Sequence, residues 1–393
     1  MSTYDFDKLT ERRNTNSVKW DEAEDSQVIP MWVADMDFKT APCIIEALKK
    51  RVNHGIFGYT LVPDSYYESI INWFKRRHQW NIEREWIQYT SGVVPAISAI
   101  VKALTQPGDK VLIQTPVYNC FFSSIRNNGC EIVESPLVVD NTDPNAPTYQ
   151  IDFDDLERKV ADPAVKLFIL CNPHNPAGRV WTQEELEHMN DICMKHGVKV
   201  LSDEIHCELI IGNHQFTPFA SISKECLDNS ITCNSPSKSF NIAGLQIANI
   251  ISNNPTTRRL IDRAININEI CDVNPFGVIA LQEAYNNGEP WLLELNRYLE
   301  GNYQALRTFF KQHLPYLKVF KLEGTYLVWV DITATGKSTD EITNLLLNEA
   351  KVMVNKGTMY GKTAGEGYIR INIACPRSRM LEGLERMEKV LHL

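Results

Sequence analysis

Residues 166–178 read KLFILCNPHNPAG and combine the signals of a strand and of a turn. Its first six residues form a short apolar run that ends in a turn signal, a pattern typical of a strand buried in a sheet. The two prolines and the glycine that follow favour a rigid turn. The stretch therefore predicts a buried strand with a polar turn, which carries Asn175, at its carboxyl end.

Short runs of Val, Ile and Leu recur on both sides of this stretch and alternate with helical periodicity. One helix start is clear because Thr182 and Glu185 have the spacing of a capping box, and this helix is expected to run to His196 and stop at Gly197. The alternation predicts an α/β fold with a mostly parallel sheet covered by helices on both faces. The other predicted strands span 110–114, 198–203, 231–233 and 248–251, and the other predicted helices span 41–53, 65–79 and 94–104.

Beyond about residue 285 the order of elements changes. A long helix is predicted over 291–312, followed by strands over 317–322, 326–331 and 368–373 and by a last helix from about Arg377. This order predicts a smaller α+β domain. We therefore expect a large domain over 47–284 and a discontinuous small domain made of 1–46 and 285–393.

Composition limits the classes of protein and of partner. The 393 residues carry a net charge of about -9, with 44% hydrophobic and 23% charged residues, which argues against a nucleic-acid or anionic-membrane surface. No window approaches the roughly 18 uninterrupted apolar residues of a membrane span, and the first thirty residues lack the apolar core of a secretory signal. The ten cysteines show no CxxC pair. We expect a cytoplasmic protein with reduced cysteines and no metal site.

Three polar residues follow three neighbouring predicted strands. Asn175 lies in the turn after the strand at 166–171, Asp203 ends the strand at 198–203, and Lys238 follows the strand at 231–233. In an open parallel sheet, ligands bind beyond the carboxyl ends of the strands. The sequence therefore predicts that an amide, a carboxylate and a lysine meet at one edge of the sheet.

The order NPxNPxG, SDE and SxSK at these separations resembles the aspartate aminotransferase superfamily, the pyridoxal-phosphate (PLP) enzymes of fold type I, and the resemblance covers nearly the whole chain. Within this superfamily the sequence is most similar to the cystathionine β-lyase branch of the MalY/PatB type. The stretches that carry this similarity are MWVADMDF at 31–38, GIFGY at 55–59, SDEIH at 202–206, PSKSFNIAGL at 236–245 and YIRIN at 368–372.

The resemblance implies a role for each of the three converging residues. Lys238 would bind PLP covalently as a Schiff base and, once released by substrate, act as a base beside the substrate Cα. Asp203 would pair with the pyridine nitrogen, and Asn175 would donate to the phenolic oxygen of the ring. Taken alone, Lys238 reads as a solvated surface lysine, Asp203 as a helix cap and Asn175 as a turn residue.

Further cofactor contacts follow from the same resemblance. Tyr118 would stack on the ring, while the backbone at Gly92 and Val93, before a predicted helix, would hold the phosphate. Tyr59 matches a phosphate-binding tyrosine that family members borrow from a neighbouring subunit, which implies a homodimer with shared active sites. Alternatively, the two tyrosines are ordinary packing residues. The remaining candidates for cofactor binding are Ser235, Ser237 and His206, which are otherwise turn or packing residues.

The substrate would be a small amino acid, and its α-carboxylate requires a planar bidentate partner. Arg370 matches the carboxylate clamp of the family, and the backbone at Ala34 matches a loop that closes over the same group. An arginine in a strand is otherwise expected to face solvent. The sequence departs from the family pattern at two positions: Gln246 replaces a phosphate-binding arginine, and Asn119 replaces a second tyrosine next to Tyr118.

The resemblance implies a C–S β-lyase that cleaves cystathionine or cysteine-type substrates to pyruvate, ammonia and a thiol. An aminotransferase uses the same residues, so it stays open as the alternative. A regulatory protein that has kept the fold is a third hypothesis, because a fold does not fix a function. The complete set of Lys238, Asp203, Asn175 and Arg370 argues against an inactive enzyme.

Overall fold

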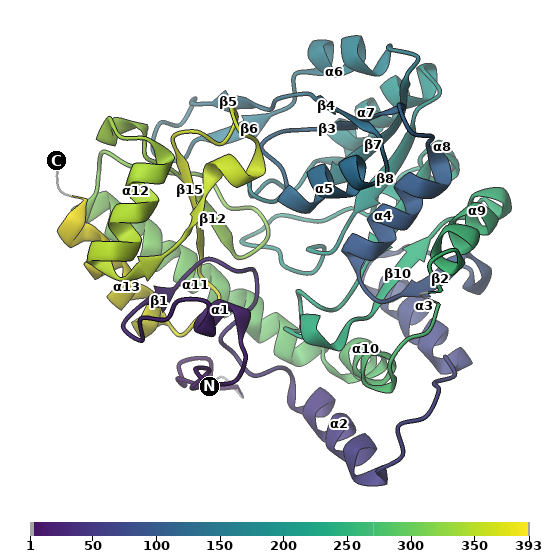
Figure 1. Ribbon diagram of the computed structural model, residues 1–393, viewed down its shortest axis with the longest axis horizontal. Helices are drawn as coiled ribbons and strands as arrows, with labels where there is room; N and C mark the ends of the chain where they lie inside the picture. Colours follow the sequence, from purple (N-terminus) through teal and green to yellow (C-terminus); the bar gives the residue numbers. More distant parts are fainter. Residues whose placement is uncertain (1–3, 270, 392–393) are drawn as a thin grey trace.

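The computed structural model describes residues 4–269 and 271–391. Within these residues, a seven-stranded sheet runs in the order β2-β10-β9-β8-β7-β3-β4 (Figure 1). Neighbouring strands from β9 to β4 are parallel, and β10 is antiparallel to both of its neighbours. The strands are β2 Ile87–Thr90, β3 Lys110–Ile113, β4 Glu131–Glu134, β7 Val165–Cys171, β8 Lys199–Asp203, β9 Ser230–Asn234 and β10 Ala248–Ile251.

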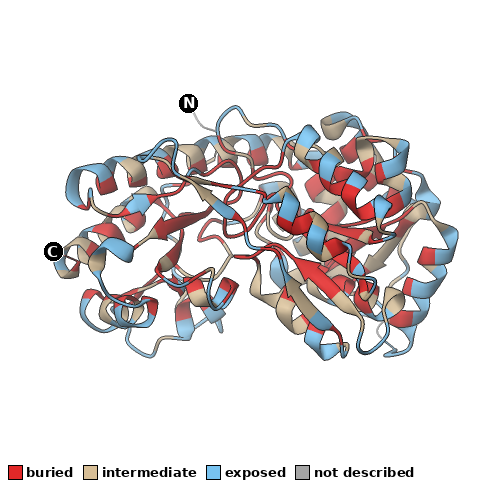
Figure 2. Ribbon diagram, turned by 90° about the horizontal axis from the view of Figure 1, so that it is seen from above, coloured by how far each residue is buried: buried red, intermediate tan, exposed pale blue. Residues whose placement is uncertain are grey.

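Helices cover both faces of this sheet, as the alternation along the sequence predicts. Successive residues of β7 point to opposite faces, so Leu167 joins one buried cluster with α4, α5 and α9, and Phe168 joins another with α6 and α7 (Figure 2). The helices around the sheet are α2 Pro42–His54, α3 Asp64–His78, α4 Val93–Leu104, α5 Asn119–Asn127, α6 Phe153–Val160, α7 Gln183–Lys195, α8 Lys224–Asn229, α9 Pro255–Asn266 and α10 Pro275–Asn287.

The C-terminal part of the chain forms an antiparallel sheet in the order β11-β12-β15-β14. The N-terminal segment joins it, since β1 Ile29–Pro30 pairs with β13 Val352–Met353. Helices α11 Glu289–His313, α12 Thr339–Leu345 and α13 Arg377–Val390 pack around this sheet (Figure 1). Its strands are β11 Lys318–Val319, β12 Leu327–Asp331, β14 Asn355–Lys356 and β15 Tyr368–Asn372, while β5 Val138–Asp140 and β6 Thr148–Gln150 form a separate hairpin and α1 spans Val18–Asp21.

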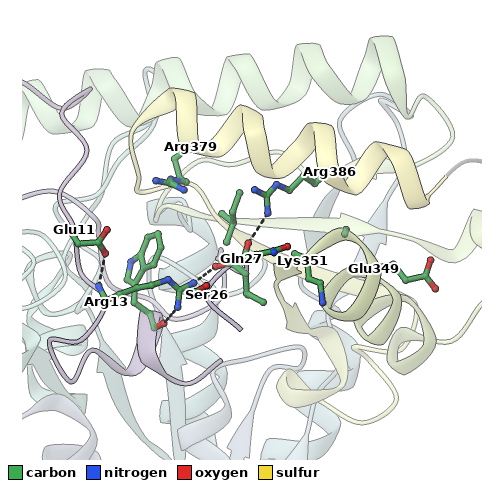
Figure 3. Close-up of a pocket in the computed structure, with 12 residues that line it drawn as sticks. Glu11, Arg13, Ser26, Gln27, Glu349, Lys351, Arg379 and Arg386 are labelled. Atoms are coloured by element: carbon green, nitrogen blue, oxygen red, sulfur yellow. Dashed lines mark hydrogen bonds between the residues drawn. The ribbon is translucent and has the colours of Figure 1, made fainter. Parts of the chain in front are cut away.

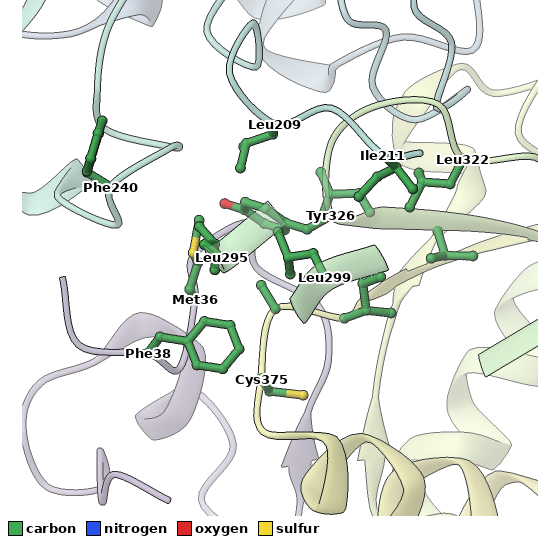
Figure 4. Close-up of a cluster of buried hydrophobic side chains, with 14 of the residues drawn as sticks. Met36, Phe38, Leu209, Ile211, Phe240, Leu295, Leu299, Leu322, Tyr326 and Cys375 are labelled. Carbon is green, nitrogen blue, oxygen red and sulfur yellow. The ribbon is translucent and has the colours of Figure 1, made fainter. Parts of the chain in front are cut away.

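One buried cluster connects the N-terminal segment to the rest of the molecule. Met36 and Phe38 pack with Leu295 and Leu299 of α11 and with Tyr326, which immediately precedes β12 (Figure 4). Burying such side chains removes apolar surface from water and stabilises each by about 1.5–3 kcal/mol. This cluster fixes the segment that carries Ala34 against the sheet edge described below.

The predicted fold class is confirmed. The capping box is present, since Thr182 accepts from Glu185 N, and α7 ends at Lys195, one residue before the predicted end. All ten cysteines are free thiols, as predicted: seven are buried, Cys43 and Cys120 are half-buried, and Cys271 is exposed. The predicted strand over 317–322 is shorter than expected, because only Lys318 and Val319 pair within the sheet. After that, Lys321 N donates to Pro147 O and leaves the sheet ladder.

The ends of the small domain predicted over 1–46 and 285–393, residues 1–3 and 392–393, lie outside the described residues. Among the described residues, no helix has the length and apolar character needed to cross a bilayer.

Candidate active site

A cavity of about 410 Å³ lies at the carboxyl edge of the parallel strands. The loops after β7 and β9 supply Asn175 and Lys238, and Asp203 is the last residue of β8, as the sequence predicts. Arg370 enters from β15, and Ala34 enters from the N-terminal segment. Ten of the predicted site residues line this cavity: Ala34, Gly92, Val93, Tyr118, Asn175, Asp203, His206, Ser237, Lys238 and Arg370.

The turn after β7 is held in one shape. Gly178 has a φ of +72°, and a Cβ there would lie 3.1 Å from the carbonyl oxygen of Lys321. Glycine adopts this left-handed conformation without strain. The backbone N–H of Gly178 donates to His174 O at 2.8 Å and closes the turn. Asn175 is thereby fixed at the cavity wall.

Asp203 ends β8 and is 3% exposed. Its Oδ1 accepts from Ile205 N at 3.1 Å, and it forms no ion pair with any described basic side chain. Burial raises the pKa of Asp203 to about 7. A buried carboxyl group in this state favours a ligand that brings a positively charged N–H, because such a group would stabilise its ionised form.

Lys238 lies opposite, in the loop after β9. Its Nζ donates to Ala34 O at 2.8 Å. Burial lowers the pKa of Lys238, and the positive charge of Arg370 lowers it further. The lysine therefore carries a larger share of neutral amine than a surface lysine does, which is the form that acts as a nucleophile or base.

Arg370 and Asn175 contact each other across the cavity. Arg370 Nη1 donates to Asn175 Oδ1 at 3.0 Å, and Arg370 Nη2 donates to Trp32 O at 2.9 Å. Arg370 is 3% exposed, and its Nε has no hydrogen-bond partner. A buried guanidinium that forms no ion pair with a described carboxylate and has a free donor is suited to bind an anionic group.

Donors for a phosphate lie at the start of α4. Gly92 is the residue before this helix and Val93 is its first residue, so their backbone N–H groups and the positive end of the helix dipole face the cavity edge. Ser237 also lines the cavity, whereas Ser235 lies behind it. Ser235 Oγ donates to Ile247 O at 2.6 Å and accepts from Ser237 N at 3.0 Å, so Ser235 supports Ser237 from the protein side.

Two ring residues complete the walls. Tyr118 is the residue before α5, and its ring makes an edge-to-face contact with Phe121 at 5.9 Å between centroids. Burial lowers the pKa of His206 to about 3, and the charges of Lys238 and Arg370 act in the same direction. His206 is therefore neutral near pH 7, and its Nδ1 has no partner.

Tyr59 is, besides Ser235, the predicted site residue that does not line the cavity. It lies in the segment between α2 and α3, and its side chain is fully exposed. The same segment exposes Ile56, Phe57 and Leu61. Monomeric proteins seldom expose such a run of large apolar side chains.

The structure adds residues that the sequence reasoning missed. Tyr360 and Asn355 line the cavity next to Arg370, and Cys120 and Met359 also line it. The N-terminal segment closes this side, because side chains donate to nearly every carbonyl from Trp32 to Phe38. These donors are Arg370, Asn355, Asn372, Lys238, Tyr326, Lys19, Arg12 and Asn241.

A larger cavity, of about 490 Å³, lies between the N-terminal segment and α13 (Figure 3). Arg13 donates there to two backbone carbonyls, Arg386 binds Glu382 and a backbone carbonyl, and Lys351 pairs with Asp25. None of the predicted site residues lines it. Its basic groups are satisfied within the protein, so the smaller cavity is the candidate active site.

One cluster of metal-ligand types lies outside both cavities. The ligand atoms of His78, Cys207 and Glu208 lie within 4.8 Å of one another. Both carboxylate oxygens of Glu208 are already used, since Trp73, Arg77 and His78 each contact them at 2.7 Å. This cluster is a buried ion-pair network that anchors the end of α3.

The donor set of the smaller cavity fits PLP. The unpaired buried carboxyl of Asp203 suits the pyridine nitrogen, and the start of α4 suits the phosphate. Asn175 Oδ1 accepts a hydrogen bond from Arg370, so the side-chain N–H₂ group of Asn175 is the part that can donate to a ligand. Lys238 supplies the amine that an aldehyde requires.

Comparison with known proteins agrees with this geometry. The family model for aminotransferase class I and II matches residues 26–387. The chain is 43% identical to cystathionine β-lyase PatB of Bacillus subtilis over 98% of this chain and 99% of that one. The resemblance to the PatB-type branch is therefore confirmed.

Solved structures give the same result. Cystalysin from Treponema denticola, which contains PLP, has a TM-score of 0.95 and 37% identity over 99% of this chain and 98% of that one. The PLP-bound C-S lyase from Staphylococcus hominis has a TM-score of 0.90 and 37% identity over 99% of both chains. The fold, the matched family model and these relatives all lead to one conclusion: the chain belongs to the family of class I and II aminotransferases.

Proposed function

We propose that this chain is a PLP-dependent C–S β-lyase that cleaves L-cystathionine or cysteine-type substrates to pyruvate, ammonia and a thiol. The observation that carries the proposal is the 43% identity to PatB over essentially the full length of both chains. The convergence of Lys238, Asp203, Asn175 and Arg370 at one cavity supports it, because these four groups meet the needs of such a reaction.

In this proposal Lys238 binds PLP, which supplies an electron sink for negative charge that develops at the substrate Cα. Asp203 holds the pyridine nitrogen, Asn175 binds the ring oxygen, and Tyr118 covers the ring face. Gly92, Val93 and Ser237 bind the phosphate. His206, neutral through burial, packs beside the ring without adding a charge.

Arg370 and the backbone at Ala34 hold the substrate in this proposal. The guanidinium binds the α-carboxylate, which its unpartnered Nε and its burial favour. Ala34 O receives hydrogen bonds from Lys238 Nζ and Tyr326, so the segment over the substrate is held in place from two sides. Binding the carboxylate fixes which bonds of Cα face Lys238.

Lys238 Nζ removes the proton from Cα. Its lowered pKa raises the share of neutral amine that can accept this proton. Loss of the proton allows the Cβ–S bond to break, with the electron pair leaving on sulfur as a thiolate that takes up a proton. Addition of one water to the remaining three-carbon fragment gives pyruvate and ammonia, so the overall reaction is a balanced hydrolysis.

We also propose that two copies of the chain form a dimer with shared sites, acting in the cytoplasm. The fully exposed Tyr59 and its exposed apolar neighbours Ile56, Phe57 and Leu61 support this, because a second copy would cover them. In such a dimer Tyr59 would reach the phosphate end of the other copy's cavity.

The first test measures pyruvate, ammonia and thiol release from L-cystathionine and L-cysteine by the PLP-loaded protein, with no keto acid added. Equal amounts of the three products over many turnovers are expected. An absence of release, with turnover restored by an added keto acid, would instead identify an aminotransferase. No turnover in either assay, with PLP bound, would favour the regulatory hypothesis.

A further inference from the structure

Arg370 lies in a row of side chains on one face of the C-terminal sheet. Its cross-strand neighbours are Trp329 on β12 and Asn355 on β14. Paired residues of adjacent strands point to the same face of a sheet and contact each other. Arg370 therefore lies between Trp329 and Asn355 in the sheet.

Tyr360 packs over this row. The guanidinium carbon of Arg370 lies 4.8 Å from the centre of the Tyr360 ring, and Trp329 contacts the same ring edge-to-face at 5.7 Å. Tyr360 is 1% exposed, and it lines the same cavity as Lys238. An arginine over an aromatic face gains from the cation–π attraction.

Hydrogen bonds fix the tyrosine in turn. Asn355 Nδ2 donates to the Tyr360 hydroxyl at 2.9 Å and to Trp32 O at 3.0 Å. Trp32 O also accepts from Arg370 Nη2 at 2.9 Å. The backbone carbonyl of Tyr360 accepts from Val117 N at 2.7 Å, next to Tyr118. Tyr360 is thus held by Asn355 of the sheet and by Val117 beside Tyr118, and Asn355 in turn binds the N-terminal segment at Trp32 O.

We propose that Tyr360 is a positioning residue for the carboxylate-binding Arg370, and that its ring rather than its hydroxyl does this. A carboxylate binds a guanidinium in the plane of the guanidinium, so the orientation of that plane sets where the α-carboxylate lies. The ring covers one face of the guanidinium and restricts tilting of its plane, while Nε has no hydrogen-bond partner among the described residues. This inference rests on the proposed role of Arg370 in carboxylate binding.

The test uses the PLP-loaded protein and three variants, Tyr360→Phe, Tyr360→Leu and Tyr360→Met. The visible spectrum of the bound cofactor is titrated with L-alanine and, separately, with ethylamine, which has the amine but no carboxylate. Both leucine and methionine remove the aromatic face. We expect the Kd for L-alanine to rise about ten-fold in these two variants, which corresponds to about 1.4 kcal/mol. The Kd for ethylamine should change by less than about two-fold.

Tyr360→Phe is decisive even where the aliphatic variants fail to fold. It keeps the ring and removes the hydroxyl, so the Kd for L-alanine should stay within about two-fold of the wild-type value. A ten-fold rise in the phenylalanine variant overturns the proposal, because the hydroxyl would then be the important group. Equal rises for L-alanine and ethylamine in the leucine variant also overturn it.

Arg370→Ala in the same titration separates this inference from the proposed function. Loss of L-alanine binding without loss of ethylamine binding supports the carboxylate clamp. Where Arg370→Ala has this effect and Tyr360→Leu does not, only the positioning role fails. Where Arg370→Ala affects both ligands equally, the clamp itself fails, and the positioning role fails with it.

Discussion

The sequence assigns two regions to the cofactor, and they differ in how far their side chains are buried. Asp203 and Arg370 are each 3% exposed, and both have partners within the chain. Tyr59 is 101% exposed, and Leu61 beside it is 85% exposed. The site residues at the sheet edge are buried within one chain, whereas the segment between α2 and α3 leaves Tyr59 and Leu61 almost fully exposed. This contrast is the one expected if a second copy of the chain supplies Tyr59, as proposed above.

The largest effect is expected from Lys238→Ala, at the centre of the buried region. Activity should fall by at least about 10³-fold, because the variant loses the group that moves the Cα proton. The absorption band of covalently bound cofactor should disappear as well. The rate and the absorption spectrum are measured together, and circular dichroism is the control for misfolding, which would change it. An unchanged spectrum would show that another residue binds the cofactor.

Glu208→Gln tests how the two regions are joined, because Glu208 anchors the end of α3. Contacts from His78 and Arg77 lower the pKa of Glu208 to about 2 although burial opposes this. A carboxylate whose pKa is lowered on folding stabilises the protein above about pH 4.5, and this stabilisation disappears as the pH falls towards 2. The variant should lose about 3 kcal/mol of unfolding free energy at pH 7.

Urea unfolding between pH 3 and pH 7 checks this prediction. The difference between wild type and Glu208→Gln should shrink as the pH falls below about 4.5. Glu289→Gln is the matched control, because Glu289 pairs with the same Arg77 but is 30% exposed. Its effect should stay below about 1 kcal/mol. A pH-independent difference between wild type and Glu208→Gln would contradict the assigned cause.

Tyr59→Ala tests the exposed region. Cofactor affinity should fall by about ten- to a hundred-fold, the range for one hydrogen bond to a charged group. Equilibrium dialysis of PLP measures this. Mixing Tyr59→Ala with Lys238→Ala chains should restore activity, because each mixed dimer then contains one complete site. Failure of mixed dimers to regain activity, while wild-type chains exchange under the same conditions, would argue that the sites are not shared.

The smallest effect is expected from Leu61→Ser. Because Leu61 is 85% exposed, the substitution should change the unfolding free energy of the dissociated chain by less than about 0.5 kcal/mol. It should nevertheless weaken association of the two copies, which sedimentation at falling concentrations would show. A loss of stability in the monomer with no change in association would show that the segment folds back on its own chain.

The elements that the sequence predicted best are those with one strong local signal. The strand and turn over 166–178 combine an apolar run with two prolines, and the helix from Gln183 has its capping box. Strands β2 and β4 were missed. Both lie at the edges of the sheet, and β4 begins and ends with exposed glutamates, which hides the apolar run.

The residues of the candidate site also differ in whether the sequence could predict them. Lys238, Asp203 and Asn175 follow predicted strands, so the topology of a parallel sheet was enough to bring them together. Tyr360 and Asn355 belong to no motif, and their contacts with Arg370 depend on how a turn and two short strands pack. Such tertiary contacts leave no periodic signal. The roles of the site residues and the domain boundaries at 46/47 and 284/285 remain predictions.

The hydrogen bonds that close the segment Trp32–Phe38 have a consequence for protein synthesis. Trp32 O accepts a hydrogen bond from Arg370, which lies 338 positions later in the chain, and Val33 O accepts one from Asn372, 339 positions later. A chain emerging from the ribosome can form the parallel sheet before its last few dozen residues have appeared. The hydrogen bonds from Arg370 and Asn372 to the segment Trp32–Phe38 cannot form until then. In the proposed function, binding of the substrate carboxylate therefore belongs to the released chain, and nascent chains cut short before residue 370 should not acquire it.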